Sequence, residues 1–220
     1  MWPLLATTTV LLAHRASAHG GALNYTVGDI WYPGYDPYGD QAMQDAAAWM
    51  PQRKWISNNP IFETTNTSLS CNTPGAPARA YIPIRAGENI TAVYSYWVHT
   101  VGPMIAWMAY CDNAENDCAT FSSETADWFK IGEKGLLEGS IETGEWFQKA
   151  FKPQFYPECA HLEVTNDKEG GSIPSEEYMV KIPGVWSMDQ PEINIDIYNP
   201  EVSAKTVYNI PGPPVWTGKP

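Results

Sequence analysis

Basic side chains are scarce in this sequence. Its 220 residues include 13 lysines and arginines against 25 aspartates and glutamates, which gives a formal net charge of −12 at pH 7. Proteins that bind nucleic acids or anionic membranes need clusters of basic residues on their surface. The composition therefore argues against both of these partners, and it suits an extracellular protein that acts on a neutral polymer.

Long hydrophobic runs are lacking after the first residues, so we expect no membrane-spanning segment. The apolar stretch at residues 3–13 is short, and Ala16-Ser17-Ala18 follows it. An apolar segment of this length before an A-x-A site is typical of a secretory signal peptide. We predict that residues 1–18 are removed and that the chain is secreted. The loss of Arg15, without any acidic residue, changes the formal charge from −12 to −13.

Helical periodicity is rare as well. Strands are predicted at residues 80–84, 90–97, 104–110, 178–182 and 193–198, the last with strict alternation of apolar and polar residues. Short strands between Pro and Gly turns predict an all-β antiparallel sandwich. The expected helices are an Ala-rich one at residues 41–50, ended by Pro51, and a short one at residues 120–130. Without a repeat or linker, residues 19–220 form one predicted domain.

Four cysteines remain after the signal peptide, namely Cys71, Cys111, Cys118 and Cys159. An even number of cysteines in a secreted chain favours two disulfides, and the count alone leaves three pairings open. Three sequons, at Asn24, Asn66 and Asn89, are candidate glycosylation sites.

The histidines of the processed chain are His19, His99 and His161. Cleavage after Ala18 makes His19 the first residue, and an N-terminal histidine offers its α-amine and its ring Nδ1 to one metal ion. A third nitrogen from another histidine completes a site of the kind that Cu(II) prefers. The residues alone leave other interpretations open: a histidine at the cleavage point by chance, a structural His99, and a core aromatic at Tyr156.

Several segments in a fixed order resemble one known family. They are His19-Gly20, Trp55-Ile56-Ser57-Asn58-Asn59-Pro60, Ser70-Cys71-Asn72, His99-Thr100-Val101-Gly102-Pro103, Trp107-Met108-Ala109, Trp128-Phe129-Lys130-Ile131, Gln154-Phe155-Tyr156-Pro157-Glu158-Cys159-Ala160, Asn194-Ile195-Asp196-Ile197-Tyr198-Asn199-Pro200 and Ile210-Pro211-Gly212-Pro213-Pro214-Val215-Trp216. In combination they are similar to the fungal lytic polysaccharide monooxygenases of auxiliary activity family nine, formerly glycoside hydrolase family sixty-one. The resemblance covers nearly the whole processed chain.

This resemblance implies a fold and a metal site. The fold is an immunoglobulin-like antiparallel β-sandwich with long loops and little helix. One copper ion is held by His19 and His99, with Tyr156 in the axial position. Gln154 and Tyr156 are the catalytic residues, with Gln154 donating the hydrogen bond that orients the oxygen co-substrate. The implied disulfides are Cys71–Cys159 and Cys111–Cys118.

The resemblance also implies a reaction and partners. O2 or H2O2 is the co-substrate, an external electron donor supplies reducing equivalents, and β-1,4-glucan such as cellulose is cleaved by hydroxylation at C1 or C4 of a sugar. A crystalline polymer cannot enter a pocket, so the metal must lie on a flat face with exposed rings that stack on sugars. Tyr35, Tyr38 and Tyr208 are the candidate rings, with Tyr32 on the same early loop. That loop also reads as an ordinary turn-rich loop, and we expect a monomer.

Two departures from the family pattern stand out. Thr100 and Val101 separate His99 from Gly102, where the family usually has one residue. The chain also runs from residues 144–147 almost directly into Gln154, without the strand and loop that carry a further histidine in family members. This is an apparent internal deletion. His161 does not replace that histidine by motif and is expected to be a structural or surface residue.

Two other functions compete with the enzyme. One is a secreted copper-binding or carbohydrate-binding relative with weak or no turnover, because a fold does not guarantee an activity. The other is a hydrolase, which needs two carboxylates at a defined separation. Acidic residues are plentiful, but no sequence pattern singles out such a pair.

The first prediction is that the secreted protein begins at His19. The Ala16-Ser17-Ala18 site directly precedes this residue. Intact-protein and N-terminal peptide mass spectrometry check the cleavage point. A single extra residue ahead of His19 would remove the amine ligand and contradict the proposed metal site.

Overall fold

The computed structural model describes residues 19–95, 101–111, 118–141, 143–146, 154–166, 172–196 and 198–218. Strands dominate these ranges and helix is sparse, so the predicted all-β sandwich is confirmed. Within the same ranges, no helix has the length and apolar character needed to cross a membrane.

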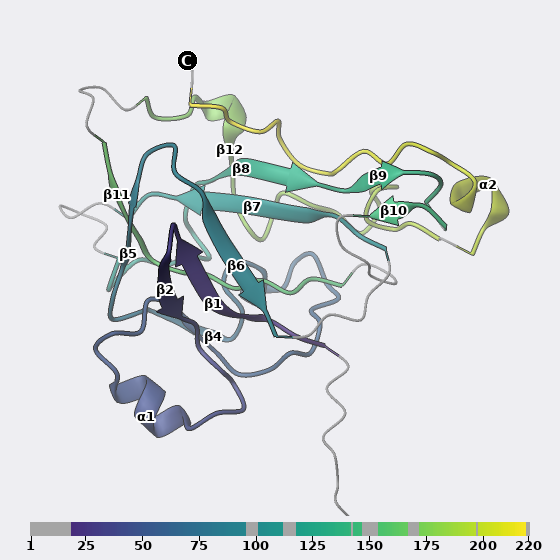
Figure 1. Ribbon diagram of the computed structural model, residues 1–220. Coiled ribbons are helices and arrows are strands. Elements are labelled where there is room, and N and C mark those ends of the chain that lie inside the picture. Colours follow the sequence, from purple (N-terminus) through teal and green to yellow (C-terminus); the bar gives the residue numbers. More distant parts are fainter. Residues whose placement is uncertain are drawn as a thin grey trace, which may run out of the picture.

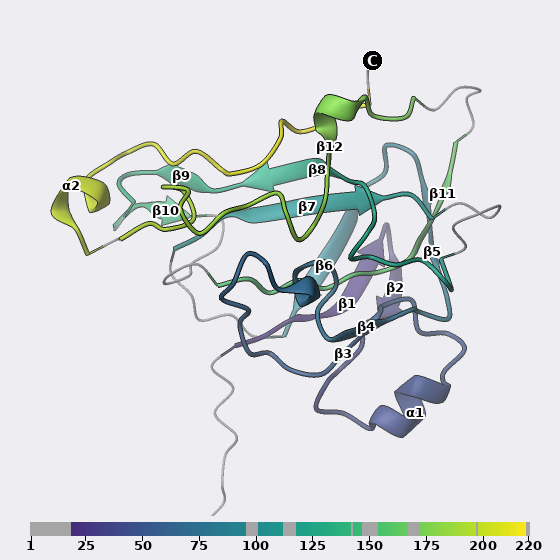
Figure 2. The same ribbon diagram turned by 180° about the vertical axis from the view of Figure 1, so that it is seen from behind.

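Two three-stranded sheets form the centre of the fold. One is ordered β2-β1-β6, from β1 (Ala22–Val27), β2 (Ile30–Pro33) and β6 (Ile90–Tyr94). The other is ordered β12-β8-β7, from β7 (Met104–Ala109), β8 (Trp128–Lys134) and β12 (Met179–Val180). All their ladders are antiparallel. Figure 1 and the reverse view in Figure 2 both place β7 and β8 above the β1–β2 hairpin.

Three two-stranded ladders join these sheets. They are β3 (Lys54–Trp55) with β4 (Pro74–Ala76), β9 (Leu136–Glu138) with β10 (Glu145–Trp146), and β5 (Ile82–Arg85) with β11 (Leu162–Thr165). The β5–β11 pair is parallel and joins the middle of the chain to the segment after Cys159. In β5, Ile82 and Ile84 are buried while Pro83 and Arg85 are exposed, as the alternation of side chains along a strand requires.

The buried apolar residues in the described ranges fall into four separate clusters rather than one continuous core. The first joins Tyr25 of β1 to Ile82 and Ile84 of β5, and the third groups Trp128 of β8 with Leu69 and Cys71. A domain of this size usually has one contiguous core. The division coincides with a large cavity that is described with the site.

The helices are shorter than the sequence suggests. Helix α1 (Gln41–Ala46) begins at the Asp40 side chain, which accepts a hydrogen bond from the Met43 N–H, and it ends at Ala47, well before Pro51. The helix predicted at residues 120–130 is wrong, because its last residues belong to β8 and pair with β7. The remaining helical elements are η1 (Thr67–Leu69), η2 (Glu176–Tyr178) and α2 (Pro200–Ser203).

The strand predicted at residues 193–198 is also wrong. The N–H groups of Ile193 and Asn194 both donate to the Gln190 carbonyl, at 3.0 and 2.7 Å, and the Tyr198 N–H donates to Asp196 Oδ1 at 3.0 Å. These local hydrogen bonds satisfy backbone groups within turns instead of a ladder. Ile197 lies outside the described residues.

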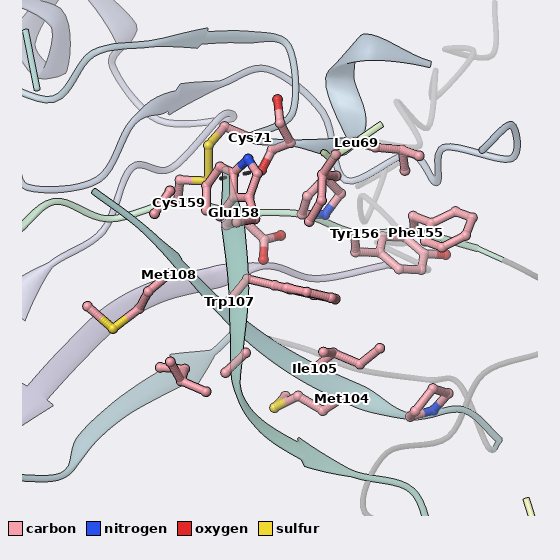
Figure 3. Close-up of a pocket in the computed structure, with 18 of the residues that line it drawn as sticks. Leu69, Cys71, Met104, Ile105, Trp107, Met108, Phe155, Tyr156, Glu158 and Cys159 are labelled. Atoms are coloured by element: carbon pink, nitrogen blue, oxygen red, sulfur yellow. Dashed lines mark hydrogen bonds between the residues drawn. A yellow bond between two sulfur atoms is a disulfide. The ribbon is translucent and has the colours of Figure 1, made fainter. Parts of the chain in front are cut away.

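Both implied disulfides are confirmed. Cys71 and Cys159 are bonded with their Cα atoms 5.3 Å apart, and Cys111 and Cys118 with theirs 4.9 Å apart. The first bond fixes the end of the 154–159 segment to the loop after η1 (Figure 3). The second closes a local loop of sequence separation 7.

The second prediction compares these two bonds. In the chain-entropy relation, the separation of 88 residues between Cys71 and Cys159 corresponds to about 4–5 kcal/mol of stabilisation. The separation of 7 between Cys111 and Cys118 corresponds to about 2 kcal/mol. Urea unfolding of the two double Cys→Ser variants measures both values. Equal losses of stability in the two variants would contradict the entropic account.

Candidate functional site

The N-terminal arm, residues 19–22, is held by hydrogen bonds at several points. The Asn58 side-chain Nδ2 donates to the His19 carbonyl at 2.7 Å, and the Ser95 N–H donates to the Gly21 carbonyl at 3.1 Å. The buried Gln52 side chain donates to the Ala22 carbonyl at 2.9 Å. The arm therefore lies in one place from its first described residue onward.

Gly21 allows the arm to lie flat on the fully buried ring of Trp55. A Cβ atom at Gly21 would stand 2.3 Å from Trp55 Cη2 and 2.9 Å from Glu158 Oε1, well inside contact distance. The Trp55 Nε1 donates to the Tyr35 carbonyl at 2.9 Å, which fixes the indole below the arm. A glycine at this position is required by the close approach.

The segment carrying Gln154 and Tyr156 is fixed along one edge. Phe155 and Ile61 exchange two backbone hydrogen bonds of 2.9 and 3.0 Å, and the Arg53 N–H donates to the Cys159 carbonyl at 2.8 Å. The Phe155 ring also stacks on Trp186 with centroids 5.2 Å apart. Because side chains alternate along an extended segment, Gln154 and Tyr156 project to the side opposite Phe155.

The structure brings His19 together with Tyr156 and Gln154, which are distant from it in sequence. The His19 and Tyr156 rings stack with centroids 5.5 Å apart and an angle of 29° between planes. The Tyr156 hydroxyl donates to Gln154 Oε1 at 2.5 Å. Burial raises the pKa of Tyr156 above its ordinary value, so the phenol stays neutral at physiological pH.

His99, the other predicted nitrogen ligand, lies outside the described residues. Within the described ranges, no three His, Cys, Asp or Glu side chains group closely enough to hold a metal ion. His19 and Tyr156 still provide a nitrogen and an oxygen donor of the kind that copper accepts. Asn58 binds the His19 carbonyl through Nδ2, while its Oδ1 is buried without a partner in the described part of the chain.

The three tyrosines expected on the substrate face have different environments. Tyr38 is 55% exposed, and its hydroxyl accepts a hydrogen bond from the Asn58 N–H at 3.3 Å. Tyr35 is 1% exposed, because its ring packs in the cluster with Met50 and Trp55, so its prediction as an exposed sugar-stacking ring is corrected. Tyr208 is half-buried, with its hydroxyl donating to the Glu192 carbonyl at 2.8 Å.

Glu158 is a buried carboxyl that joins the arm to the 154–159 segment. It accepts hydrogen bonds from the Ala22 N–H and from the Tyr94 hydroxyl, the latter at 3.4 Å. Burial raises the pKa of Glu158 to about 8, and the two hydrogen bonds oppose that rise. Near neutral pH the carboxyl therefore holds a proton beneath the arm.

His161 belongs to a separate buried cluster. Its Nε2 lies 3.5 Å from Nη1 of Arg53, and its ring centroid lies 5.5 Å from that of Tyr81. Arg53 in turn donates to the carbonyls of Gly75 and Phe121, at 2.6 and 3.1 Å. This environment agrees with the structural role expected for His161.

A cavity of about 480 Å³ lies next to the site. Figure 3 shows Phe155, Tyr156, Glu158 and Cys159 on one side of it and Met104, Ile105, Trp107 and Met108 of β7 on the other. Protein interiors are close-packed, with few voids larger than a water molecule. This volume is therefore unusual beside an otherwise well-anchored segment.

The chain matches a family profile over most of its length. The profile of Auxiliary Activity family 9 (formerly GH61) matches residues 19–153 and 147–208. The chain belongs to Auxiliary Activity family 9. Family members are generally copper-dependent enzymes that cleave polysaccharides oxidatively, and membership makes this chain a monooxygenase.

Known members of the family support this assignment. Family 9 lytic polysaccharide monooxygenase B of Heterobasidion irregulare is 36% identical over 252 aligned residues, covering 98% of each chain. Monooxygenase D of Thermothelomyces thermophilus is 30% identical, over 94% of this chain and 92% of the relative. The crystal structure of HiLPMO9B has a TM-score of 0.78 at 35% identity, over 91% of this chain and 100% of the other.

The sequence patterns do not identify two residues of this site. Asn58 lies within the motif of residues 55–60, which does not predict its contact with His19. Glu158 lies next to Cys159, and nothing in that motif predicts the burial of its carboxyl under the arm. Their place in shared motifs was a signal, whereas their partners are distant in sequence and depend on the fold.

The third prediction concerns Glu158 and pH. Its folded-state pKa of about 8 lies above the ordinary value of 4.5, so between these values the folded protein retains a proton that the unfolded chain releases. Stability is therefore lost as pH rises from about 4.5 to about 8. Glu158→Gln removes the titration and should raise the free energy of unfolding at pH 9 by about 1–3 kcal/mol.

At pH 4 the same substitution should leave stability nearly unchanged. The Glu158 carboxyl is then mostly protonated in both the folded and the unfolded protein. Chemical denaturation of both proteins at pH 4 and pH 9, in metal-free buffer, provides the comparison. A Glu158→Gln effect of the same size at both pH values would contradict the burial of an ionisable carboxyl.

Proposed function

We propose that this chain is a secreted, copper-dependent enzyme that cleaves β-1,4-glucan chains, cellulose in particular, by hydroxylating C1 or C4 of a sugar. The observation that carries the proposal is the stacking of His19 on Tyr156, with Gln154 bonded to the tyrosine hydroxyl. His19 lies far from Gln154 and Tyr156 in the sequence. The relative from M. thermophila, solved as a cellulose-active polysaccharide monooxygenase, is 28% identical with a TM-score of 0.78.

In this proposal His19 and His99 hold the copper. Signal cleavage after Ala18 frees the His19 amine, which binds together with the ring Nδ1. Bound copper supplies the one-electron redox chemistry needed to attack a strong C–H bond with O2 or H2O2. The overall change is C–H to C–OH. With O2, an external donor provides two electrons, two protons are taken up, and the second oxygen atom leaves as water.

Tyr156 and Gln154 shape the space beside the metal. Beside a bound copper, the neutral phenol of Tyr156 would be a weak donor rather than a strong anionic ligand, because burial raises its pKa. The Tyr156 hydroxyl donates to Oε1 of Gln154, so the Nε2 of that amide points away from the tyrosine. We propose that these amide N–H groups donate to the oxygen co-substrate and orient it.

The substrate face is proposed to lie around Tyr38. Its ring is exposed, and its hydroxyl bonds to the same Asn58 that holds the His19 carbonyl. Aromatic rings on a flat surface stack on the apolar faces of sugar rings, which suits a polymer too large for a pocket. The acidic composition repels polyanions and leaves a neutral glucan as the fitting partner.

A second candidate is a secreted copper-binding or glucan-binding relative with little turnover. The observation that favours it is the cavity of about 480 Å³ beside Gln154 and Tyr156, which leaves one side of these residues without packing. Oxidised oligosaccharide release from cellulose, measured with a reductant and O2 or H2O2, separates the two. Binding of copper and cellulose without oxidised products would favour this second function.

The fourth prediction tests the ligand set. His19→Ala and His99→Ala should each weaken copper binding by about 100-fold or more, whereas Tyr156→Phe should retain it, because the substitution removes only a neutral phenol and no nitrogen ligand. Isothermal titration calorimetry of the processed protein measures the affinities.

His161→Gln is the matched control, because His161 lies in the Arg53 cluster. It should keep the parental affinity. A His161→Gln variant that loses copper as completely as His19→Ala would contradict the proposed ligand set.

A further inference from the structure

The sheet of β2, β1 and β6 turns one face to the core and the other to solvent. Tyr25 and Val27 of β1 belong to the buried cluster that includes Ile82 of β5. Successive side chains of a strand point to opposite faces, so the residues between these two lie on the other side of the sheet. We call that side the outer face, and the strand pairings place on it Asn24, Thr26, Trp31, Pro33, Thr91 and Val93.

Two of the three sequons lie on this outer face. The sequon at residues 24–26 is part of β1, and its first and third side chains both project outward. The sequon at residues 89–91 leads into β6, with Asn89 exposed in the sequence just before the strand. Thr26 and Thr91 are direct partners in the β1–β6 ladder. The two sequons therefore run antiparallel beside each other on one surface.

The third sequon has a different setting. It lies in η1, outside the sheet, and the Asn66 side chain accepts a hydrogen bond from the Ser68 N–H at 2.9 Å. Its asparagine therefore serves as the N-cap of a short helix. This sequon is a natural reference for the two on the sheet.

The outer face also carries apolar side chains in contact with water. Trp31 is 57% exposed and Val93 is 41% exposed. Val93 is the ladder partner of Asn24, and Trp31 is the partner of Thr26, which places Trp31 diagonal to Asn24. Opposed and diagonal side chains of neighbouring strands lie within about 8 Å of each other. A group attached to Asn24 is therefore within reach of both apolar side chains.

The exposed tryptophan lies on a strand at the edge of its sheet. In the described part of the chain, β2 pairs with β1 alone. Ile30, next to Trp31, is 60% exposed. An exposed edge strand with apolar side chains is a template for pairing with another chain. A bulky hydrophilic group beside Trp31 would block that association.

We propose that Asn24 and Asn89 carry N-linked glycans, and that the glycan on Asn24 covers the Trp31 ring and Val93. The proposal rests on the secretion that is part of the proposed function, because this modification takes place in the secretory pathway. The asparagine Nδ2 attacks the anomeric carbon of a lipid-diphosphate-linked oligosaccharide. A C–N bond forms, the anomeric C–O bond to the diphosphate breaks, the amide loses one proton, and the lipid diphosphate leaves.

The direction of the Asn24 side chain makes this modification compatible with the fold. The nascent chain offers the sequon in extended form before β1 pairs with its neighbours. After pairing, the outward side chain keeps its glycan in solvent, whereas a glycan on the side of Tyr25 would prevent the packing of the core. The apolar face of a sugar ring can then lie on the Trp31 indole, as sugars do on aromatic rings.

The Asn89 glycan occupies the other end of the same sheet. Ile90 pairs with Val27, the last residue of β1, whereas the N-terminal arm joins β1 at its first residue. A glycan on Asn89 therefore lies at the end of the sheet away from His19.

The experiment first maps the modified asparagines. Residues 19–220 are produced in yeast behind an unrelated secretory signal, so the result does not depend on the chain's own leader. Peptide N-glycosidase in heavy-oxygen water converts each glycosylated asparagine into a labelled aspartate, which peptide mass spectrometry locates. Labels are expected at Asn24 and Asn89. An unlabelled Asn24 or Asn89, or a label on Asn66 alone, overturns the proposal.

The second measurement tests whether the Asn24 glycan covers Trp31. Hydroxyl-radical footprinting compares the oxidation of Trp31 in the parental glycoprotein and in Asn24→Gln. Oxidation should rise by about twofold or more in the variant, because the indole loses its sugar cover. Asn66→Gln is the matched control, since it removes a sequon outside the sheet and should leave Trp31 oxidation unchanged.

Equal Trp31 oxidation in Asn24→Gln and the parental protein overturns the proposed cover. Light scattering checks both proteins for dimers, and a parental dimer that protects Trp31 assigns the outer face to a second copy and also overturns it. If Asn24→Gln is not secreted, the glycans are released from the folded parental protein with the same enzyme, and Trp31 is footprinted before and after. Unchanged oxidation after release overturns the cover.

These readouts need neither copper nor cellulose, and the signal is supplied from outside. Failure of the proposed glycans is therefore distinguishable from failure of the proposed catalytic function or of the predicted leader.

Discussion

The arrangement of this molecule depends on the contact between the N-terminal arm and the segment that ends at Cys159. Among the described residues, the ladder pairing of the arm begins at Ala22, so its place before that residue is set by Asn58, by the flat approach of Gly21 to Trp55, and by Glu158 from beneath. The disulfide to Cys71 fixes the segment on its other side. Between them these restraints hold the arm and the segment where the His19 and Tyr156 rings stack.

The groups that make this contact are polar, and removing polar groups from water costs free energy. A carboxyl beneath a strand loses its hydration, and the hydrogen bonds from Ala22 and Tyr94 compensate only in part, so Glu158 takes up a proton. The carboxyl oxygens accept from the Ala22 N–H and from the Tyr94 hydroxyl, and so join a backbone group to a phenol. The arm is thereby held by directional bonds, whereas apolar packing alone would leave its register less defined.

Local patterns predicted part of this structure. The alternation in β5 and the apolar run of β7 gave strands close to their observed positions, because burial on one face forces that pattern. The alternation at residues 193–198 predicts a strand that does not form, because short polar side chains there bond to the local backbone. The burial of Tyr35 was equally out of reach, since it depends on Trp55 and Met50 packing across a loop.

The residues of the candidate site were likewise only partly predictable from the sequence. The identities of His19, Gln154 and Tyr156 came from motifs, and the structure brings these three side chains together. The roles of Asn58 and Glu158 came only from their contacts. Motifs identify residue types that chemistry needs, whereas the groups that position them are chosen by long-range packing, which no local pattern encodes.

Asn58 links the surface to the interior. Its backbone N–H binds the exposed Tyr38 hydroxyl, and its side chain binds the His19 carbonyl. A displacement of this one residue therefore moves an outer ring and the start of the chain together. One residue thus serves as the shared anchor of an exposed ring and of the start of the chain, so a contact made at Tyr38 and the placement of His19 depend on the same side chain and its own backbone.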